Sequence, residues 1–207
     1  DWILLAAGRG NLFSVDAAAQ GVAIEELGTV DRTRRVAEVR LDGVSPLARI
    51  GRPGAAGPAI ERMLDAGRAV LSADTVGACQ SMLDRAVAYA LERKQFERVI
   101  ASFQAVKHMC AEIAAELEPT RSLFWYAAHA FDAAPGEAPL VIAHAKCRAD
   151  EVGRFAARTA TEVHGGVGFT DEQNLHVWFK RIELNRQLLG GPDALRERAA
   201  DLQGWTT

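Results

Sequence analysis

Residues 59–94 read AIERMLDAGRAVLSADTVGACQSMLDRAVAYALERK. Apolar side chains recur through this segment at the spacing of one face of an α-helix. They are Ile60, Met63, Leu64, Val70, Leu71, Met82, Leu83, Val87 and Leu91. Pro58 precedes the segment, where a proline suits the first helical turn because its missing N–H has no partner to lose there. The segment therefore predicts one long helix from residue 59 to about residue 94.

Further helical patterns follow this segment, separated by residues that break helices. The first spans about 103–131 and contains Pro119, which we expect to kink it. The next two span about 140–163 and 174–189, and a short tail helix follows Pro192. Long helices joined by short breaks predict an antiparallel four-helix bundle.

The segment before the long helix has a different pattern. Residues 1–50 form short apolar or alternating runs between turn residues, as in an antiparallel β-meander with one wet face. The run GRPGAAGP at residues 51–58 is the clearest boundary. We therefore predict a mainly α fold, in which a small antiparallel β segment (a partial β-domain, 1–52) precedes a helical bundle domain (58–207). Because the chain enters an apolar run without an initiator methionine, we expect upstream residues to be missing.

Composition excludes several classes of protein. With 207 residues, 49% hydrophobic and 25% charged, the chain resembles an ordinary folded protein. A net charge of -3 without a basic block argues against nucleic-acid binding, and no apolar run approaches the length of a membrane span. The three cysteines are scattered without a CxxC pair, which indicates free thiols in the cytoplasm. The histidines lack the Glu-x-x-His spacing of a di-iron bundle, so we expect no metal site.

Two segments carry a more specific signal. The first reads YALERKQF at residues 89–96 and continues as SFQAVKH at residues 102–108. The second reads VHGGVGFTDE at residues 163–172. Both lie between predicted helices, and they resemble the two signatures of the acyl-CoA dehydrogenase family, Arg-x-x-Phe-Gly…Phe-Gln and Gln-x-x-Gly-Gly-x-Gly-Phe. Residues 34–44 also look like the end of the family's middle β-domain, so the resemblance extends over essentially the whole chain.

The resemblance implies a flavoprotein that binds FAD at a subunit interface. In the family, the arginine of the first signature reaches across a dimer interface to the partner's FAD, and Arg93 holds that position here. A pyrophosphate favours a cation and free N–H donors, and glycines let a backbone approach it closely. The residues that the resemblance places against FAD are Arg93, Gln95, Phe96, Ile100, Phe103, Glu162, Gly165 and Gly166. The resemblance also implies a homo-oligomer or a heteromer with another subunit of the same family.

Two residues of the signatures depart from the family pattern. Glu97 stands where the first signature has glycine, and Glu162 stands where the second has a glutamine that meets the flavin nucleotide. A carboxylate beside a pyrophosphate is unfavourable unless it is paired or protonated, so both changes should weaken FAD binding unless the nearby Arg93, Lys94 or Arg98 offsets them.

A further departure concerns the general base. The family removes the α-proton of an acyl-CoA thioester with a glutamate while a hydride leaves the β-carbon for the flavin. In most members this glutamate follows the last long helix, where this chain has Leu189; in others it lies on the first helix, one residue before the position of Arg68, where this chain has Gly67. Neither residue can take a proton. Asp65 is the candidate base nearest to the second position, and Asp65 and Arg68 are candidates for contact with the acyl-CoA.

Three hypotheses follow from this pattern. In the first, the chain is a non-catalytic subunit of a flavin-dependent acyl-CoA dehydrogenase, and another chain brings the glutamate, as in systems that degrade fatty acids or steroid side chains. In the second, the protein is self-sufficient and uses an unusual base such as Asp65. In the third, it is a non-enzymatic helical module that serves assembly alone.

Overall fold

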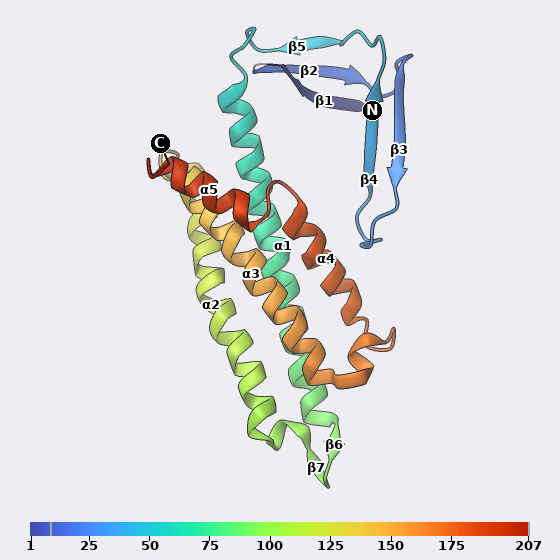
Figure 1. Cartoon of the computed structure of the whole chain (residues 1–207), viewed down its shortest axis with the longest axis vertical. Helices are drawn as coiled ribbons and strands as arrows, with labels where there is room; N and C mark the ends of the chain where they lie inside the picture. Colours follow the sequence, from blue (N-terminus) through green and yellow to red (C-terminus); the bar gives the residue numbers. More distant parts are fainter. Residues whose placement is uncertain (9, 207) are drawn as a thin grey trace. The chain divides into compact units, whose positions relative to one another are not determined.

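The computed structural model describes residues 1–8 and 10–206, and the chain divides into a unit of residues 1–64 and a unit of residues 65–207 (Figure 1). The first unit carries the strands β1 (Trp2–Ala7), β2 (Asn11–Asp16), β3 (Val22–Leu27), β4 (Val36–Leu41) and β5 (Ala48–Ile50). The helices are α1 (Gly57–Glu92), which begins in the first unit, α2 (Gln104–Ala133), α3 (Ala138–His164), α4 (Leu175–Gln187) and α5 (Pro192–Leu202). The fold is therefore mainly α with a small antiparallel β segment, as the sequence predicted.

The strands of the first unit pair differently from the predicted meander. β1 pairs antiparallel with β2, and β3 pairs antiparallel with β4, but β2 takes β5 as its second neighbour. In the turn that follows β2 in the chain, the Asp16 carboxylate accepts a hydrogen bond from the Ala18 N–H (3.0 Å), and Gly21 adopts φ +91°. This turn directs β3 out of the sheet, so the prediction of one continuous meander was wrong.

Helices α1, α2, α3 and α4 share one hydrophobic core in the second unit. Met82 and Ala86 of α1, Ile113 and Leu117 of α2, Ala156 and Ala160 of α3, and Ile182 of α4 are all fully buried in it. Gly153 of α3 marks the closest approach, because a Cβ there would lie 2.7 Å from Thr75 Cγ2 and 2.9 Å from Ile182 Cγ2. The predicted bundle therefore forms around α3, whose small residues let α1 and α4 approach its backbone.

Helix ends follow the breakers that the sequence indicated. α3 ends where Gly165 adopts φ +63° and donates its N–H to the carbonyls of Thr161 and Glu162. α2 continues through Pro119, and the hydroxyl of Thr120 donates to the Glu116 carbonyl (2.7 Å) in the same turn. The tail helix α5 packs on α3 by placing Leu195 and Ala199 against Ala143.

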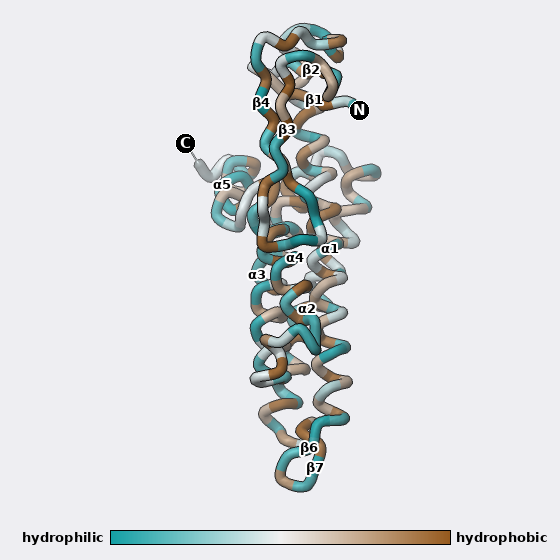
Figure 2. Tube along the Cα trace, turned by 90° about the vertical axis from the view of Figure 1, so that its right-hand side faces the viewer, coloured by the Kyte–Doolittle hydropathy of each residue, from teal (hydrophilic) through white to brown (hydrophobic). Residues whose placement is uncertain are grey.

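A short hairpin between α1 and α2 was not predicted. Its strands are β6 (Lys94–Gln95) and β7 (Arg98–Val99), and the 3-10 turn η1 (Ile100–Ser102) follows. Strands of two residues carry no detectable alternation, so periodicity could not indicate them. Figures 1 and 2 place this hairpin at one end of the bundle, and Figure 2 shows hydrophilic and hydrophobic positions alternating along the helices. Among the described residues, no helix combines the length and the apolar character that crossing a bilayer requires.

Candidate functional site

The two signatures meet in space. Tyr89, at the start of the first signature, stacks on His164 of the second with ring centroids 4.6 Å apart and an interplanar angle of 22°. Figure 1 shows the β6–β7 hairpin and the 3-10 turn η2 (Gly165–Phe169) toward the same end of the bundle. Segments about seventy residues apart in the sequence (89–108 and 163–172) therefore belong to one region, which we call the signature end.

The turn of the β6–β7 hairpin holds two bulky residues in a strained backbone conformation. Phe96 has φ +53° and Glu97 has φ +62°, the left-handed region that two-residue hairpin turns usually fill with Asn-Gly. The Phe96 side chain is 85% exposed. A left-handed residue with a Cβ costs about 1–2 kcal/mol, so local sequence does not explain this turn by itself. Strain of this kind concentrates at sites of ligand or partner contact.

The other predicted cofactor residues of the first signature lie around this turn. The ring of Phe103 packs edge-on to Phe96 at 6.1 Å between centroids, and the Arg98 guanidinium lies 4.0 Å above it. Arg93 and Gln95 are exposed, and the Gln95 amide donates to the neighbouring Lys94 carbonyl (2.8 Å). Ile100 closes the hairpin by donating its N–H to the Arg93 carbonyl (2.8 Å). Two guanidinium groups and two aromatic rings are thus gathered within eleven residues of chain.

The fold requires glycine at some positions of the second signature and not at others. A Cβ at Gly168 would lie 2.8 Å from the Thr161 carbonyl oxygen, so this glycine is required by packing inside the chain. A Cβ at Gly165 or Gly166 would meet no described atom within 4 Å. Gly165 needs its left-handed φ to end α3, but Gly166 does not have a positive φ. The fold itself therefore gives no reason for a glycine at position 166.

His164 is the buried polar residue of this end. Its Nδ1 lies 2.7 Å from the Ala160 carbonyl oxygen, and burial lowers the pKa of its imidazole below the usual value. The neutral ring that donates from Nδ1 is therefore favoured at neutral pH, with its face against Tyr89. This stacked pair left no signal in the sequence, because only the packing of α1 on α3 brings the two rings together.

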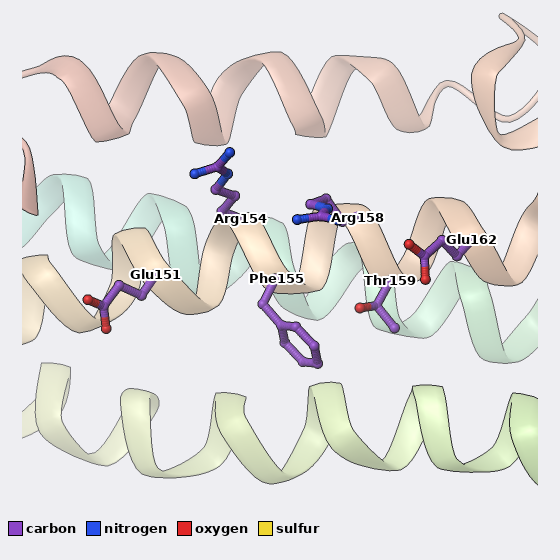
Figure 3. A pocket seen from close by; sticks show the side chains of 6 residues that line it. All are labelled: Glu151, Arg154, Phe155, Arg158, Thr159 and Glu162. Atoms are coloured by element: carbon purple, nitrogen blue, oxygen red, sulfur yellow. The ribbon is translucent and has the colours of Figure 1, made fainter.

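Glu162 lines an open groove of about 480 Å³ along α3, together with Glu151, Arg154, Phe155, Arg158 and Thr159 (Figure 3). Arg158 lies one turn before Glu162 on the same helix face, and Arg154 lies one turn before Arg158. The unfavourable charge that Glu162 introduces is therefore accompanied by two guanidinium groups in the same groove.

Gly67 and Leu189, which the sequence predicts to stand at the two general-base positions, lie in direct contact. Leu189 follows α4, and its Cδ1 would lie 2.4 Å from a Cβ built at Gly67 of α1. Leu189 itself adopts φ +58° and Gly190 φ +104° in the turn of residues 188–191, which we call the α4–α5 turn. One methyl group thus occupies the notch left by the glycine. Two residues far apart in the sequence therefore lie at one place in the fold.

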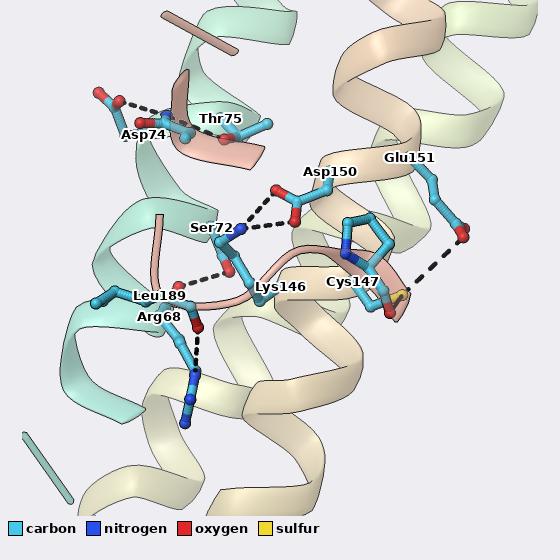
Figure 4. A network of polar contacts seen from close by, with 11 residues as sticks. Arg68, Ser72, Asp74, Thr75, Lys146, Cys147, Asp150, Glu151 and Leu189 are labelled. Atoms are coloured by element: carbon cyan, nitrogen blue, oxygen red, sulfur yellow. Dashed lines mark hydrogen bonds and ion pairs between the residues drawn. The ribbon is translucent and has the colours of Figure 1, made fainter. Parts of the chain in front are cut away.

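A chain of polar contacts fixes this place, and Figure 4 shows the first of them, between Arg68 and Leu189. The Arg68 Nε–H donates to the Leu189 carbonyl oxygen at 2.9 Å, and its Nη1 donates to Asp65 Oδ1 at 2.7 Å. Asp65 is buried, and Nη2 of Arg198 from α5 donates to its Oδ2 at 3.2 Å. Arg198, 133 residues from Asp65, carried no signal in the sequence. The arrangement ties α1, the α4–α5 turn and α5 together through one carboxylate.

A buried ion pair lies on α3 near this turn. Lys146 Nζ donates to both carboxylate oxygens of Asp150, at 2.8 and 2.6 Å, and both side chains have no exposed surface (Figure 4). Burial raises the pKa of the Asp150 carboxyl to about 6 and lowers the pKa of the Lys146 amine. The interior on this side of the bundle therefore depends on a fully satisfied polar pair.

The signature end and the α4–α5 turn lie far apart within one chain. Continuous helix separates residue 67 from residue 92 of α1, which is roughly 38 Å at 1.5 Å per residue. Arg93 and Gly67 therefore cannot contact the same reacting atoms. No group of three or more His, Cys, Asp or Glu in the described part of the chain could hold a metal ion.

Comparisons with known proteins agree with this reading of the fold. The model of the "Acyl-CoA dehydrogenase, C-terminal domain" family matches residues 57–201. Acyl-CoA dehydrogenase IpdE2 of Mycobacterium tuberculosis is 34% identical over 174 residues, which are 84% of this chain and 50% of that protein.

Two solved structures are similar over most of the chain. A variant of the Tcur3481–Tcur3483 steroid ACAD superposes with a TM-score of 0.83 at 32% identity, covering 94% of this chain and 52% of that one. The ChsE4–ChsE5 complex of Mycobacterium tuberculosis gives 0.84 at 28% identity, over 95% and 53%. The chain spans about half the length of these relatives. It belongs to the acyl-CoA dehydrogenase family and contains the family's C-terminal domain.

Proposed function

We propose that this chain is a non-catalytic subunit of a heteromeric, flavin-dependent acyl-CoA dehydrogenase. The observation that carries the proposal is the contact between Gly67 and Leu189. Both positions at which the family places its general base come together in one site, and neither residue has a group that can accept a proton. The catalytic glutamate must then come from another chain.

The signature end supports a role in holding FAD. When bound, FAD would accept the hydride that leaves the β-carbon of the acyl group. Arg93 is exposed at the hairpin and would neutralise the diphosphate, with Gln95 beside it. Phe96 and Phe103 would cover the cofactor with apolar surface, and the open space at Gly166 would admit it close to the backbone. Arg154 and Arg158, which line the same groove as Glu162, would offset its charge.

The distance along α1 favours an interface-crossing role for Arg93. A flavin whose ring lay near Gly67 would be out of reach of Arg93 in the same chain, because roughly 38 Å of helix separates them. Arg93 would instead serve the cofactor of a neighbouring subunit. The proposal therefore includes an oligomer, in which this chain completes a site on its partner.

The relatives suggest the kind of complex and substrate. One similar structure is a complex of two named proteins, ChsE4 and ChsE5, and another is a steroid ACAD. We extend these properties to this chain as proposals: a heteromer with another acyl-CoA dehydrogenase subunit, and an acyl-CoA that carries a bulky side chain such as that of a steroid.

Asp65 as an unusual general base is the alternative for catalysis. Its carboxylate is buried and accepts hydrogen bonds from the guanidinium groups of both Arg68 and Arg198. Both carboxylate oxygens accept these hydrogen bonds, so the carboxylate is engaged in contacts within the chain. The geometry therefore favours a positioning role for Asp65, and it gives Arg68 a partner other than an acyl-CoA.

The test is the visible spectrum of the full-length protein, purified alone and with its partner subunit, before and after an acyl-CoA is added. We expect the flavin band to bleach only in the complex. This bleaching should disappear when the partner's glutamate is replaced by glutamine. Bleaching by this protein alone would contradict the proposal, and its abolition by Asp65→Asn would then identify Asp65 as the base. A complex that binds no flavin would point to a structural module.

A further inference from the structure

We propose that Leu189 seals the acyl-binding space of this chain, so that the chain excludes the acyl group as well as lacking the base. This inference rests on the proposed function and concerns the same site. Its basis is the shape of the site: a leucine side chain lies between the two positions from which a base would act.

The location of the missing space follows from the chemistry of the two positions. A general base must come within hydrogen-bonding reach of the carbon-bound proton that it removes. A glutamate at position 67 and a glutamate at position 189 could serve the same reaction only if the substrate's α-carbon lay within reach of both. That carbon would therefore lie over the surface where Gly67 and Leu189 face each other. In this chain the Leu189 methyl group occupies that surface, since its Cδ1 would lie only 2.4 Å from a Cβ at Gly67.

The backbone of Leu189 is held by a sharp turn and by a hydrogen bond from Arg68. Its left-handed φ of +58° and the φ of +104° at Gly190 turn the chain sharply after α4. The Arg68 guanidinium donates to its carbonyl oxygen at 2.9 Å. Arg68 is itself fixed by Asp65, whose other guanidinium partner, Arg198, belongs to α5. Asp65 and Arg68 therefore act as positioning residues for the closed turn.

The seal differs from ordinary core packing. Leu189 is 37% exposed, so its side chain does not lie in the interior of the bundle. It covers the glycine notch from the surface, as a side chain that blocks an opening would. A smaller residue at 189 would leave the notch of Gly67 open without removing a member of the buried core.

The first experiment tests the contact without using activity. Thermal unfolding is measured for Gly67→Ala and for the matched control Gly77→Ala on the same helix, where a Cβ meets no described atom within 4 Å. Replacing an exposed helical glycine by alanine should raise the Tm by about 2–4 °C in the control. We expect no such gain at position 67 in the wild-type background and a gain restored in the Leu189→Ala background. An equal gain at positions 67 and 77 with Leu189 present would overturn the contact.

The second experiment tests ligand entry in the assembled full-length protein. The number of bound butyryl-CoA molecules is measured by equilibrium dialysis, with CoA itself as the control ligand, for wild type, Leu189→Ala and Leu202→Ala. Leu202 lies on α5, is 46% exposed and serves as the matched leucine truncation. We expect Leu189→Ala to bind an additional butyryl-CoA for each copy of this chain, at least about tenfold more tightly than CoA, because every buried methylene contributes roughly fourfold. Leu202→Ala should bind like wild type.

The outcomes separate this inference from the proposed function. If wild type already binds butyryl-CoA once for every copy of this chain without flavin bleaching at that site, the seal is refuted and the non-catalytic role stands. If that bound ligand also bleaches a flavin when the partner's glutamate is replaced, both are refuted. If Leu189→Ala binds no more than wild type, Leu189 is not the seal.

Discussion

The signature end and the α4–α5 turn both combine glycines with arginines, but they use them in opposite ways. At the signature end, Arg93 and Phe96 face outward, and the space over Gly166 is open. At the α4–α5 turn, Arg68 is paired with Asp65, and the notch of Gly67 is filled by Leu189.

This difference supports the proposal that the signature end, and not the α4–α5 turn, contacts a ligand or partner outside this chain. At the signature end, the Arg93 and Phe96 side chains are exposed and the Phe96–Glu97 turn is strained, so contacts within the fold do not explain them. Residues of the α4–α5 turn satisfy each other, so they need no ligand to explain their arrangement. A family member that kept its cofactor contacts and lost its reaction would show this contrast.

The largest effect is expected from disrupting the buried ion pair near the α4–α5 turn. Lys146→Met leaves the buried Asp150 carboxylate without its cation and should lower the free energy of unfolding by about 3–5 kcal/mol. The double variant Lys146→Met/Asp150→Leu should recover most of this loss, because no buried charge remains. Chemical denaturation measures both, with Arg35→Ala of the exposed Arg35–Glu26 pair as a control that changes stability by at most about 1 kcal/mol. If Lys146→Met lowers the free energy of unfolding no more than Arg35→Ala does, the Lys146–Asp150 pair is hydrated.

The next largest effect is expected at the signature end, on FAD affinity. Arg93→Ala should weaken FAD binding by about 1.5–3 kcal/mol, roughly ten- to a hundredfold, because a charge-assisted hydrogen bond to the diphosphate is lost. The stability of the flavin-free protein should not change, since the Arg93 side chain is exposed. Flavin titration of the assembled protein measures the affinity, and Lys180→Ala, an exposed cation on α4, is the control. Unchanged affinity in Arg93→Ala would place the diphosphate elsewhere.

The second signature allows a comparison within one loop. Gly168→Ala forces a Cβ against the Thr161 carbonyl oxygen and should destabilise the protein by about 1–3 kcal/mol. Gly166→Ala meets no described atom within 4 Å, so its stability should stay within about 0.5 kcal/mol of wild type while its flavin affinity falls. Thermal unfolding and flavin titration of the two variants separate packing from ligand contact. Equal behaviour of the two alanines would remove the argument that position 166 faces a cofactor.

The smallest effect is expected from replacing Glu97 in the strained turn of the β6–β7 hairpin. Glu97→Gly should stabilise the protein by up to about 1 kcal/mol, because glycine adopts φ +62° without penalty. It should also raise FAD affinity slightly by removing a carboxylate. Glu97→Gln removes the charge and keeps the strain, so it should raise affinity without the gain in stability. If Glu97→Gln matches Glu97→Gly in both measurements, charge rather than backbone strain governs this turn.

Sequence patterns indicated the local features of this chain well. The helical period over residues 59–94 predicted α1, and the glycine pair at 165 and 166 predicted the end of α3, because both depend on hydrogen bonds between neighbours in sequence. The pairing of β2 with β5 was missed, and so was the β6–β7 hairpin, because partner choice and very short strands leave no local period.

The amino-acid sequence alone determined that residues 67 and 189, the predicted general-base positions, are a glycine and a leucine without a carboxyl group. It did not determine that Leu189 touches Gly67, or that Arg68 bonds to a carbonyl 121 residues away. Those contacts depend on how α1 packs beside the end of α4, and on a left-handed turn at Leu189 that no local preference favours. Packing between distant segments therefore brought a glycine and a leucine, neither of which is distinctive in the sequence, into direct contact.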